Sequence, residues 1–192
     1  MKDFFLVLAS GSPYRHQLLA RLGVPFEPWS PQVDESALAG ESPRETARRL
    51  ARSKAQAAHA KFPDALVVGS DQVAELDARP IGKPANRANA TQQLRMMRGR
   101  VVQFHTAVCL LADGRLQEET VTTEVAFRDL TDAEIERYLD REPAFDCAGS
   151  AKSEALGIAL LDRLSGDDPT ALVGLPLIAL ARMLRAEGIE VP

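Results

Sequence analysis

Three acidic residues have the side chains and positions for metal or phosphate chemistry. Asp71 follows the apolar stretch of VVGSDQV, residues 67–73, and Asp34 and Glu35 are adjacent in the polar segment VDES. A carboxylate at the end of a buried strand is costly without a partner, and strand ends in α/β sheets often line a ligand crevice. The structural alternatives are that Asp71 caps a turn or pairs with a buried arginine, and that the adjacent acids are solvated. Together the three carboxylates predict an all-oxygen site for a hard cation such as Mg²⁺ or Mn²⁺.

Three basic residues have the chemistry to hold an anion. Arg15 lies in ASGSPYRHQLL, beside a predicted helix start, Lys54 lies on a second predicted helix, and Lys83 lies in the turn IGKP. The glycine of IGKP lets backbone amides approach an anion, and its proline fixes the bend that follows. Each cation alone is more often a surface charge, but together, in an acidic chain, they predict a local anion pocket.

Two further segments combine small residues with charged ones. CAGSAKSEALG carries Lys152 and Glu154, and SGDDPTALVGLP precedes an apolar helix whose start it can shape. The sequence contains no Walker-type glycine loop, G-x-G-x-x-G, H-E-x-x-H or G-x-S-x-G motif. A serine nucleophile at Ser10 or Ser12 is disfavoured because neither has an evident histidine base.

The composition sets the class of protein. The chain has 192 residues, 45% of them hydrophobic and 26% charged, with a net charge of -4. These values predict one globular domain over residues 1–192 and argue against a nucleic-acid binder. Apolar runs are too short for a membrane helix or a signal peptide. The two cysteines, Cys109 and Cys147, lack metal-ligand spacing, so we expect a cytoplasmic protein with no membrane partner.

Strand and helix signals alternate along the chain. Capping signals predict helices that begin at Ser12-Pro13, at Ser42-Pro43 with Glu45, near Asn86 and at Thr131 with Glu134. The hairpin turn Asp113-Gly114 joins two long strands. We expect strands over 4–9, 24–29, 66–76, 101–112 and 116–127, a polar loop over 32–42, and a last helix over 172–187. This order predicts a single-domain α/β fold, a mixed curved sheet flanked by helices.

The motifs, taken in order, resemble those of the Maf family of nucleoside triphosphate pyrophosphatases. The matching segments cover essentially the whole chain: LASGSPYRHQLL, VDE at 33–35, Lys54-Ala55, GSDQV at 69–73, GKP at 82–84, CAGS at 147–150, Glu154, and SGD with VGLP near the end. The resemblance implies a central cleft, as in the inosine triphosphatases, and cleavage between the α- and β-phosphates of a nucleotide. It also implies a divalent cation (Mg²⁺ or Mn²⁺, with Co²⁺ possible in the family), a small-molecule nucleotide substrate and a homodimer.

The resemblance assigns roles to particular residues. It makes Asp71 the proton acceptor, Glu35 and Asp71 the metal ligands, and Lys54, Lys83 and Arg15 catalytic cations. It places Ser10, Ser12 and Arg15 on the phosphates, and Tyr14, Gln72 and Glu154 at the positions that set specificity. A link between the family and septum formation keeps open an alternative role as a nucleotide-binding regulator of cell division with low turnover.

Tyr14 and Gln72 indicate the subgroup. Most members that act on thymidine or uridine nucleotides have Arg and Thr there, so the chain is more similar to the subgroup that acts on 7-methyl-GTP, which usually has Trp in place of Tyr14. An N7-methylated guanine is cationic and stacks well on an electron-rich ring, and Glu154 can accept hydrogen bonds from its edge. Hydrolysis of dTTP or UTP, and a packing role for Tyr14 at the helix start, are the alternatives.

Overall fold

The computed structural model describes residues 4–191, so residues 1–3 and 192 of the predicted domain lie outside the described part of the chain. The strands are β1 (Leu6–Ala9), β2 (Glu27–Pro28), β3 (Leu66–Leu76), β4 (Arg79–Ile81), β5 (Val101–Ala112), β6 (Arg115–Phe127) and β7 (Leu161–Ser165). The α-helices are α1 (Pro13–Ala20), α2 (Pro43–Lys61), α3 (Arg87–Met97), α4 (Asp132–Arg141) and α5 (Leu177–Ala186), with short 3₁₀ turns at Ala148–Ser150 and Leu156–Leu160.

The local signals place the helix starts correctly. The hydroxyls of Ser12, Ser42 and Thr131 cap their helices, and Ser42 and Thr131 form complete capping boxes with the glutamates three residues on. Asn86 caps α3 in the same way. These predictions are confirmed because a cap depends on residues within one turn of each other.

The last helix is shorter than the sequence predicted. It was expected over 172–187, but α5 covers Leu177–Ala186. Gly174 has a φ of 129°, which interrupts any helix there, and Pro176 is the N-cap. Residues 172–176 therefore form a turn whose backbone carbonyls serve other groups. Strands β4 and β7 were not predicted, because one has three residues and the other, LDRLS, is almost entirely exposed.

All the strands belong to one mixed sheet, which confirms the predicted fold class. The order is β2-β1-β3-β5-β6-β7, with β4 paired to β3. Strands β2, β1 and β3 run parallel, and every other pairing is antiparallel. Along one edge of β3, the pairing with β1 ends at Gly69 and the pairing with β4 begins at Ala74. Residues 70–73 therefore face an opening between two neighbouring strands.

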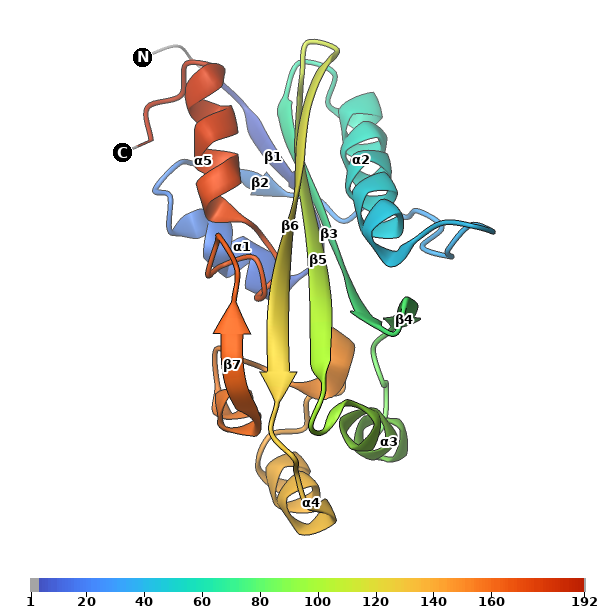
Figure 1. Ribbon diagram of the computed structural model, residues 1–192. Helices are drawn as coiled ribbons and strands as arrows, with labels where there is room; N and C mark the ends of the chain where they lie inside the picture. Colours follow the sequence, from blue (N-terminus) through green and yellow to red (C-terminus); the bar gives the residue numbers. More distant parts are fainter. Residues whose placement is uncertain (1–3, 192) are drawn as a thin grey trace.

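The two strands that follow β1 in the chain lie on opposite sides of it. The chain passes through α1 to β2 on one side of β1, and then through α2 to β3 on the other side. Figure 1 shows α1 and α5 covering one face of the upper part of the sheet, α2 covering the other face, and α3 and α4 at the lower end. In open α/β sheets, ligands bind at the carboxyl ends of strands where the strand order reverses in this way. The end of β1 is the expected place for a site.

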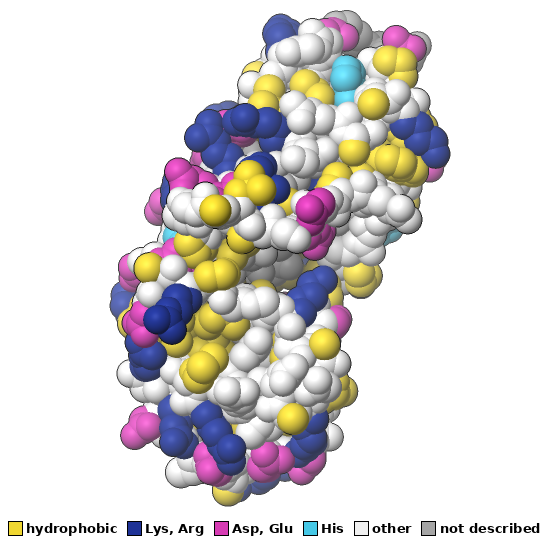
Figure 2. All heavy atoms as spheres, turned by 90° about the vertical axis from the view of Figure 1, so that its right-hand side faces the viewer, with side chains coloured by type: hydrophobic (Ala, Val, Ile, Leu, Met, Phe, Trp, Pro, Cys, Tyr) yellow, Lys and Arg dark blue, Asp and Glu magenta, His cyan; other side chains and the backbone are white. Residues whose placement is uncertain are grey.

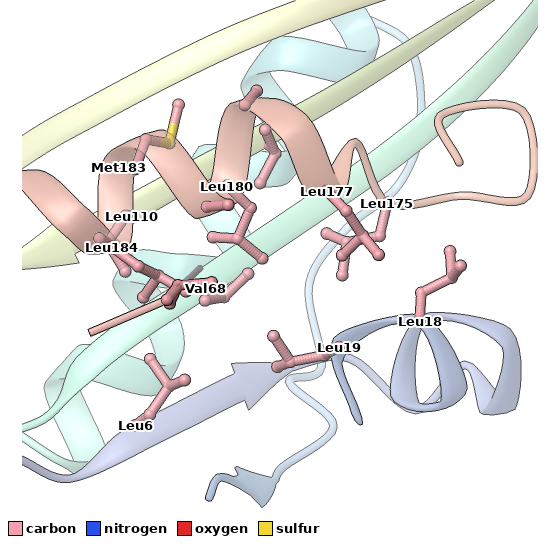
Figure 3. Close-up of a cluster of buried hydrophobic side chains, with 14 of the residues drawn as sticks. Leu6, Leu18, Leu19, Val68, Leu110, Leu175, Leu177, Leu180, Met183 and Leu184 are labelled. Atoms are coloured by element: carbon pink, nitrogen blue, oxygen red, sulfur yellow. The ribbon is translucent and has the colours of Figure 1, made fainter. Parts of the chain in front are cut away.

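The core lies in separate apolar clusters on the two sides of this opening. Figure 3 shows α5 packed through Leu180 and Leu184 over Leu6 and Val68, with Leu18 and Leu19 of α1 nearby. A second cluster joins α3 and α4 to the lower parts of β5 and β6. None of the helices within residues 4–191 is long and apolar enough to cross a membrane.

Helix α2 approaches the sheet very closely. A Cβ atom at Gly69 would lie 2.2 Å from the carbonyl oxygen of Ala51, so only glycine fits there. A run of alanines, Ala47, Ala51, Ala55 and Ala58, forms the buried face of the helix. This contact brings the α2 side chains within reach of β3.

Candidate active site

A cavity of about 300 Å³ lies at the carboxyl end of β1, where the connections reverse. Its lining comes from the β1–α1 turn, the loop after β2, α2, the β4–α3 connection and the segment after α4: Ala9, Ser10, Gly11, Ser12, Pro13, Tyr14, Arg15, Ser30, Pro31, Glu35, Lys54, Lys83 and Asp146. The face of the molecule that carries α2 and α3 is narrowed at mid-height, and acidic and basic side chains are mixed over it (Figure 2). We call the cavity of about 300 Å³ at the end of β1 the site cavity.

Lys54 joins the two predicted metal ligands. Its Nζ lies 2.6 Å from Asp71 Oδ1 and 2.6 Å from Glu35 Oε1. Lys54 and Asp71 are both 7% exposed, whereas the Glu35 side chain is 62% exposed. The sequence raised a buried arginine as a possible partner of Asp71, and the partner is this lysine of α2. The hydrogen bond from Lys54 is the main reason that the pKa of Glu35 lies below its usual range, against a smaller opposing effect of burial.

The β1–α1 turn is organised around two serines. The Ser12 hydroxyl accepts a hydrogen bond from the Arg15 N–H (3.4 Å), and the Ser12 N–H donates to Ser10 Oγ (3.2 Å). The Arg15 side chain is held by the backbone, since its Nε donates to the carbonyl of Gly174 at 2.8 Å. Burial lowers the pKa of the Arg15 guanidinium, while Asp71 and Glu35 act in the opposite direction. A helix start beside a fixed guanidinium favours an anion.

Lys83 closes the basic side of the cavity. It is exposed, lies in the connection between β4 and α3, and its charge lowers the pKa of Glu35 after the larger effect of Lys54. The structure thus brings together Ser10, Ser12, Arg15, Glu35, Lys54, Lys83 and, through Lys54, Asp71.

Tyr14 meets two residues that the sequence did not select as site residues. Its hydroxyl donates to Asp146 Oδ2 at 2.9 Å, and Lys152 Nζ lies 3.0 Å from Asp146 Oδ1 and 5.6 Å from the centroid of the Tyr14 ring. Burial raises the pKa of Tyr14. Burial opposes the ionisation of Asp146, but the hydrogen bonds from Lys152 and Tyr14 hold its pKa below the usual range. Asp146 immediately precedes the CAGS segment. Its contact with Tyr14, 132 positions away in the sequence, is what identifies it as a site residue.

Two predicted specificity residues lie outside the lining that the described residues form. Gln72 projects from the face of β3 opposite to Asp71, and its Nε2 lies within 3.0 Å of Thr106 Oγ1 and the carbonyls of Ala171 and Leu172. Because carbonyls only accept, these contacts fix the amide orientation and leave Oε1 as an acceptor. Glu154 is exposed in a turn close to Lys152. The specificity roles of both residues stay predictions.

The carboxylates of the cavity suit a divalent cation that is held largely by substrate. The carboxylates of Glu35 and Asp71 both point to one position, which is occupied by Lys54 Nζ. Residues 4–191 contain no cluster of three or more His, Cys, Asp or Glu side chains that could form a metal cage. Asp34, the third predicted acid, accepts a hydrogen bond from the Ser36 N–H at 2.9 Å within its own turn. Two carboxylates completed by phosphate and water are typical of Mg²⁺.

A larger cavity of about 470 Å³ lies at the opposite end of the sheet, beside Phe4, Phe5 and Ile189. Its charged lining residues are Asp64, Asp113 and Glu187. Such a lining repels a polyphosphate, which favours the site cavity as the candidate phosphate site.

The fold and the site cavity define an α/β protein with basic and carboxylate side chains gathered at the switch point of an open sheet, an arrangement that suits a phosphate ligand. The family model described as Maf-like protein matches residues 5–187. The chain therefore belongs to the Maf family, as the sequence predicted.

Curated relatives match nearly the full chain. It is 58% identical over 188 residues to the 7-methyl-GTP pyrophosphatase of Albidiferax ferrireducens, covering 97% of this chain and 94% of the relative. It is 60% identical over 189 residues to the 7-methyl-GTP pyrophosphatase of Aromatoleum aromaticum, covering 97% of each.

Solved structures share the fold at low identity. A HAM1 protein from Coxiella burnetii matches with a TM-score of 0.51 and 19% identity, over 67% of this chain and 75% of that one. Protein VC0702 from Vibrio cholerae matches with a TM-score of 0.51 and 14% identity, over 97% of this chain and 99% of that one.

Proposed function

We propose that this protein is a nucleoside triphosphate pyrophosphatase that converts 7-methyl-GTP to 7-methyl-GMP and pyrophosphate. The observation that carries the proposal is the placement of Lys54 between Asp71 and Glu35, beside the α1 start that holds Arg15. The names of the relatives supply the substrate.

The phosphate groups bind at the basic side of the cavity. Arg15 and Lys83 approach the polyphosphate, and the backbone amides near Ser12 add donors at the helix start. Arg15 is held by the Gly174 carbonyl, so it is positioned before substrate arrives. Preorganised cations of this kind stabilise the charge that spreads over the phosphoryl oxygens.

Asp71 is the proton acceptor in this proposal. A water oxygen attacks the α-phosphorus, the bond from that phosphorus to the bridging oxygen breaks, and pyrophosphate leaves. Asp71 takes the proton from the water once the phosphates draw the Lys54 ammonium toward them. The burial of Asp71 favours this role, because a carboxylate shielded from bulk water interacts more strongly with the charges around it.

Glu35 and Asp71 would hold a divalent cation, Mg²⁺ or Mn²⁺, with Co²⁺ as a third candidate. When bound, such an ion neutralises phosphate charge and lowers the pKa of water. The convergence of the two carboxylates on one cation, Lys54 Nζ, supports this assignment.

Tyr14 reads the base in this proposal, with Gln72 and Glu154 as further specificity residues. Its ring lies at the lining of the cavity under a lysine ammonium, in the type of contact that a cationic 7-methylguanine would make. The competing substrates are dTTP and UTP.

The test is a pyrophosphate-release assay over 7-methyl-GTP, GTP, dTTP and UTP, with Mg²⁺, Mn²⁺ or Co²⁺ and a chelator control. We expect the fastest release from 7-methyl-GTP, equal amounts of pyrophosphate and monophosphate, and loss of activity with chelator. Release of single phosphates would contradict the assigned bond. Tight nucleotide binding without release would favour the regulator of cell division.

We also propose a homodimer located in the cytoplasm, where nucleotides are found. Exposed apolar side chains in the 3₁₀ turn Leu156–Leu160 and the following strand β7, namely Leu156, Ile158 and Leu164, support a protein contact. One chain has a mass of 20.9 kDa, and light scattering should give twice that mass. A monomer at micromolar concentration would contradict the dimer.

A further inference from the structure

The cluster of Tyr14, Asp146 and Lys152 joins two parts of the molecule across the site cavity. Tyr14 lies in the first turn of α1, whereas Asp146 and Lys152 flank the 3₁₀ turn that follows α4. Asp146 bonds to both partners through different oxygens, Oδ2 to Tyr14 at 2.9 Å and Oδ1 to Lys152 at 3.0 Å. The carboxylate is therefore fixed in direction, although its side chain is 56% exposed.

An aromatic face and a carboxylate here hold one cation together. Lys152 Nζ lies 5.6 Å from the Tyr14 ring centroid and also contacts Asp146. A cation above a tyrosine ring is attracted by the ring electrons, and a carboxylate at the same point adds a direct charge interaction. The same two groups would attract a positively charged aromatic base.

Asp146 is the carboxylate of the lining that remains for this purpose. The acidic residues that line the site cavity are Glu35 and Asp146. Glu35 lies 2.6 Å from Lys54 Nζ, at the phosphate-binding groups. Asp146 contacts Tyr14 instead, so its charge is placed beside the ring on which the base would stack.

We propose that Asp146 is a specificity-determining residue whose negative charge selects a cationic purine over an uncharged one, and that Lys152 occupies the cation position until the base displaces it. This inference rests on the proposed function for its substrate class. It predicts opposite effects for the two charges, because Asp146 attracts the methylated base and Lys152 competes with it.

The test compares 7-methyl-GTP with GTP, which has the same ring system without the methyl group and its positive charge. Binding is measured by calorimetric titration in chelator, so that the result does not depend on turnover. Asp146 is more than half exposed, and exposed charge pairs contribute little to binding. We therefore expect Asp146→Asn to lower the preference for 7-methyl-GTP about two- to fivefold. Asparagine keeps an acceptor for the Tyr14 hydroxyl, which separates loss of charge from loss of position.

Lys152→Met should raise the same preference by about two- to fivefold, because the base no longer competes with an ammonium. Asp162→Asn is the matched control: it removes one exposed carboxylate from β7, and the preference should stay at the wild-type value. Added salt should reduce the difference between wild type and Asp146→Asn by screening.

Equal changes for both nucleotides in Asp146→Asn, or a lowered preference in Lys152→Met, would overturn the inference and leave Tyr14 positioning as the role of the cluster. A wild-type protein that binds both nucleotides equally would also overturn it. Failure of the proposed function would give a different result from failure of this inference. In that case the protein would bind 7-methyl-GTP in preference to GTP but would release no pyrophosphate from it.

Discussion

The two ends of the site cavity differ in how their charged groups are held. The phosphate end has Arg15, Glu35 and Lys54, with Asp71 bound to Lys54, and the base end has Tyr14 and Asp146, with Lys152 bound to Asp146. At the phosphate end, Lys54 and Asp71 come from a long helix and the middle of a long strand, and both are buried, whereas Glu35 lies on an exposed loop and is held by its ion pair with Lys54. At the base end, Asp146 and Lys152 lie in irregular chain between α4 and β7. Asp146 is more than half exposed.

This difference separates two requirements of one site. Phosphoryl transfer depends on groups that hold their positions, and regular elements supply that precision. Base selection can change with residues on loops while the phosphate machinery stays the same. Changes at the phosphate end should therefore remove activity on every nucleotide, and changes at the base end should redistribute it.

The largest effect is expected at Asp71. Asp71→Asn removes the proton acceptor but keeps the shape of the side chain, so turnover should fall by about 10²–10⁴-fold on every nucleotide tested. Steady-state pyrophosphate release measures it, and circular dichroism with thermal unfolding checks that the fold survives. Near-normal turnover in this variant would remove Asp71 from the mechanism.

Lys54 should show the next largest effect. Lys54→Met leaves two carboxylates facing each other without their shared cation, and about 10²-fold of turnover should be lost. The free energy of unfolding should fall by about 1–3 kcal/mol, below the cost of a fully buried pair because Glu35 is exposed. Denaturant unfolding measures this loss. Mn²⁺ should restore more stability to this variant than to wild type, and no such difference would contradict the assigned metal ligands.

Tyr14 should redistribute activity without abolishing it. Tyr14→Arg places a cation against a cationic base, so kcat/KM for 7-methyl-GTP should fall about tenfold relative to dTTP and UTP. Tyr14→Trp is the matched control, because it keeps an aromatic face and should keep the preference. A uniform fall on all four nucleotides in the arginine variant would assign Tyr14 to packing at the helix start.

The smallest effect concerns the loop that carries Glu35. Glu41 accepts hydrogen bonds from Arg49 at 2.7 and 2.9 Å, and Arg49 also holds the Ser36 carbonyl at 2.8 Å. The bonds from Arg49 are the main cause that lowers the pKa of Glu41 to about 2. Since a free glutamate titrates near about 4.3, the stabilisation is complete above that pH and is lost as the pH falls toward 2.

Wild-type melting temperature should therefore drop as the pH falls from about 4.3 to about 2, and Glu41→Gln should flatten that drop by on the order of 2–4 °C. Glu134 is the matched control, because its pKa is also about 2, owing to the Thr131 N–H and then Arg128. Glu134→Gln should flatten the drop without changing activity, whereas Glu41→Gln should also lower turnover by about two- to fivefold. Equal activity in both variants would detach Glu41 from the site.

The phosphate end was more open to prediction from the sequence than the base end. Asp71 stands out because a charged residue interrupts an apolar strand, and Lys54 lies on a helix whose start is marked by a complete capping box. Asp146 has no such local signal, since its role depends on Tyr14, 132 positions away. Lys152 was noticed in its small-residue segment, but its partner was not.

The elements of the fold differ in the same way: those set by neighbouring residues were predicted, and those set by distant contacts were not. Caps and the Asp113-Gly114 hairpin depend on neighbouring residues, and the structure has both. The last helix was predicted too long because its apolar pattern continues through Gly174, whose backbone conformation a helix cannot include. Strand β7 was missed because its side chains face solvent and only its backbone pairs with β6.

The most direct test of a base-reading role for Tyr14 compares kcat/KM for pyrophosphate release from 7-methyl-GTP and dTTP by the wild-type protein and Tyr14→Arg. Wild type should prefer 7-methyl-GTP, the arginine variant should lose most of that preference, and both should release pyrophosphate. Faster hydrolysis of dTTP than of 7-methyl-GTP by the wild-type protein would rule out a site built for the methylated base.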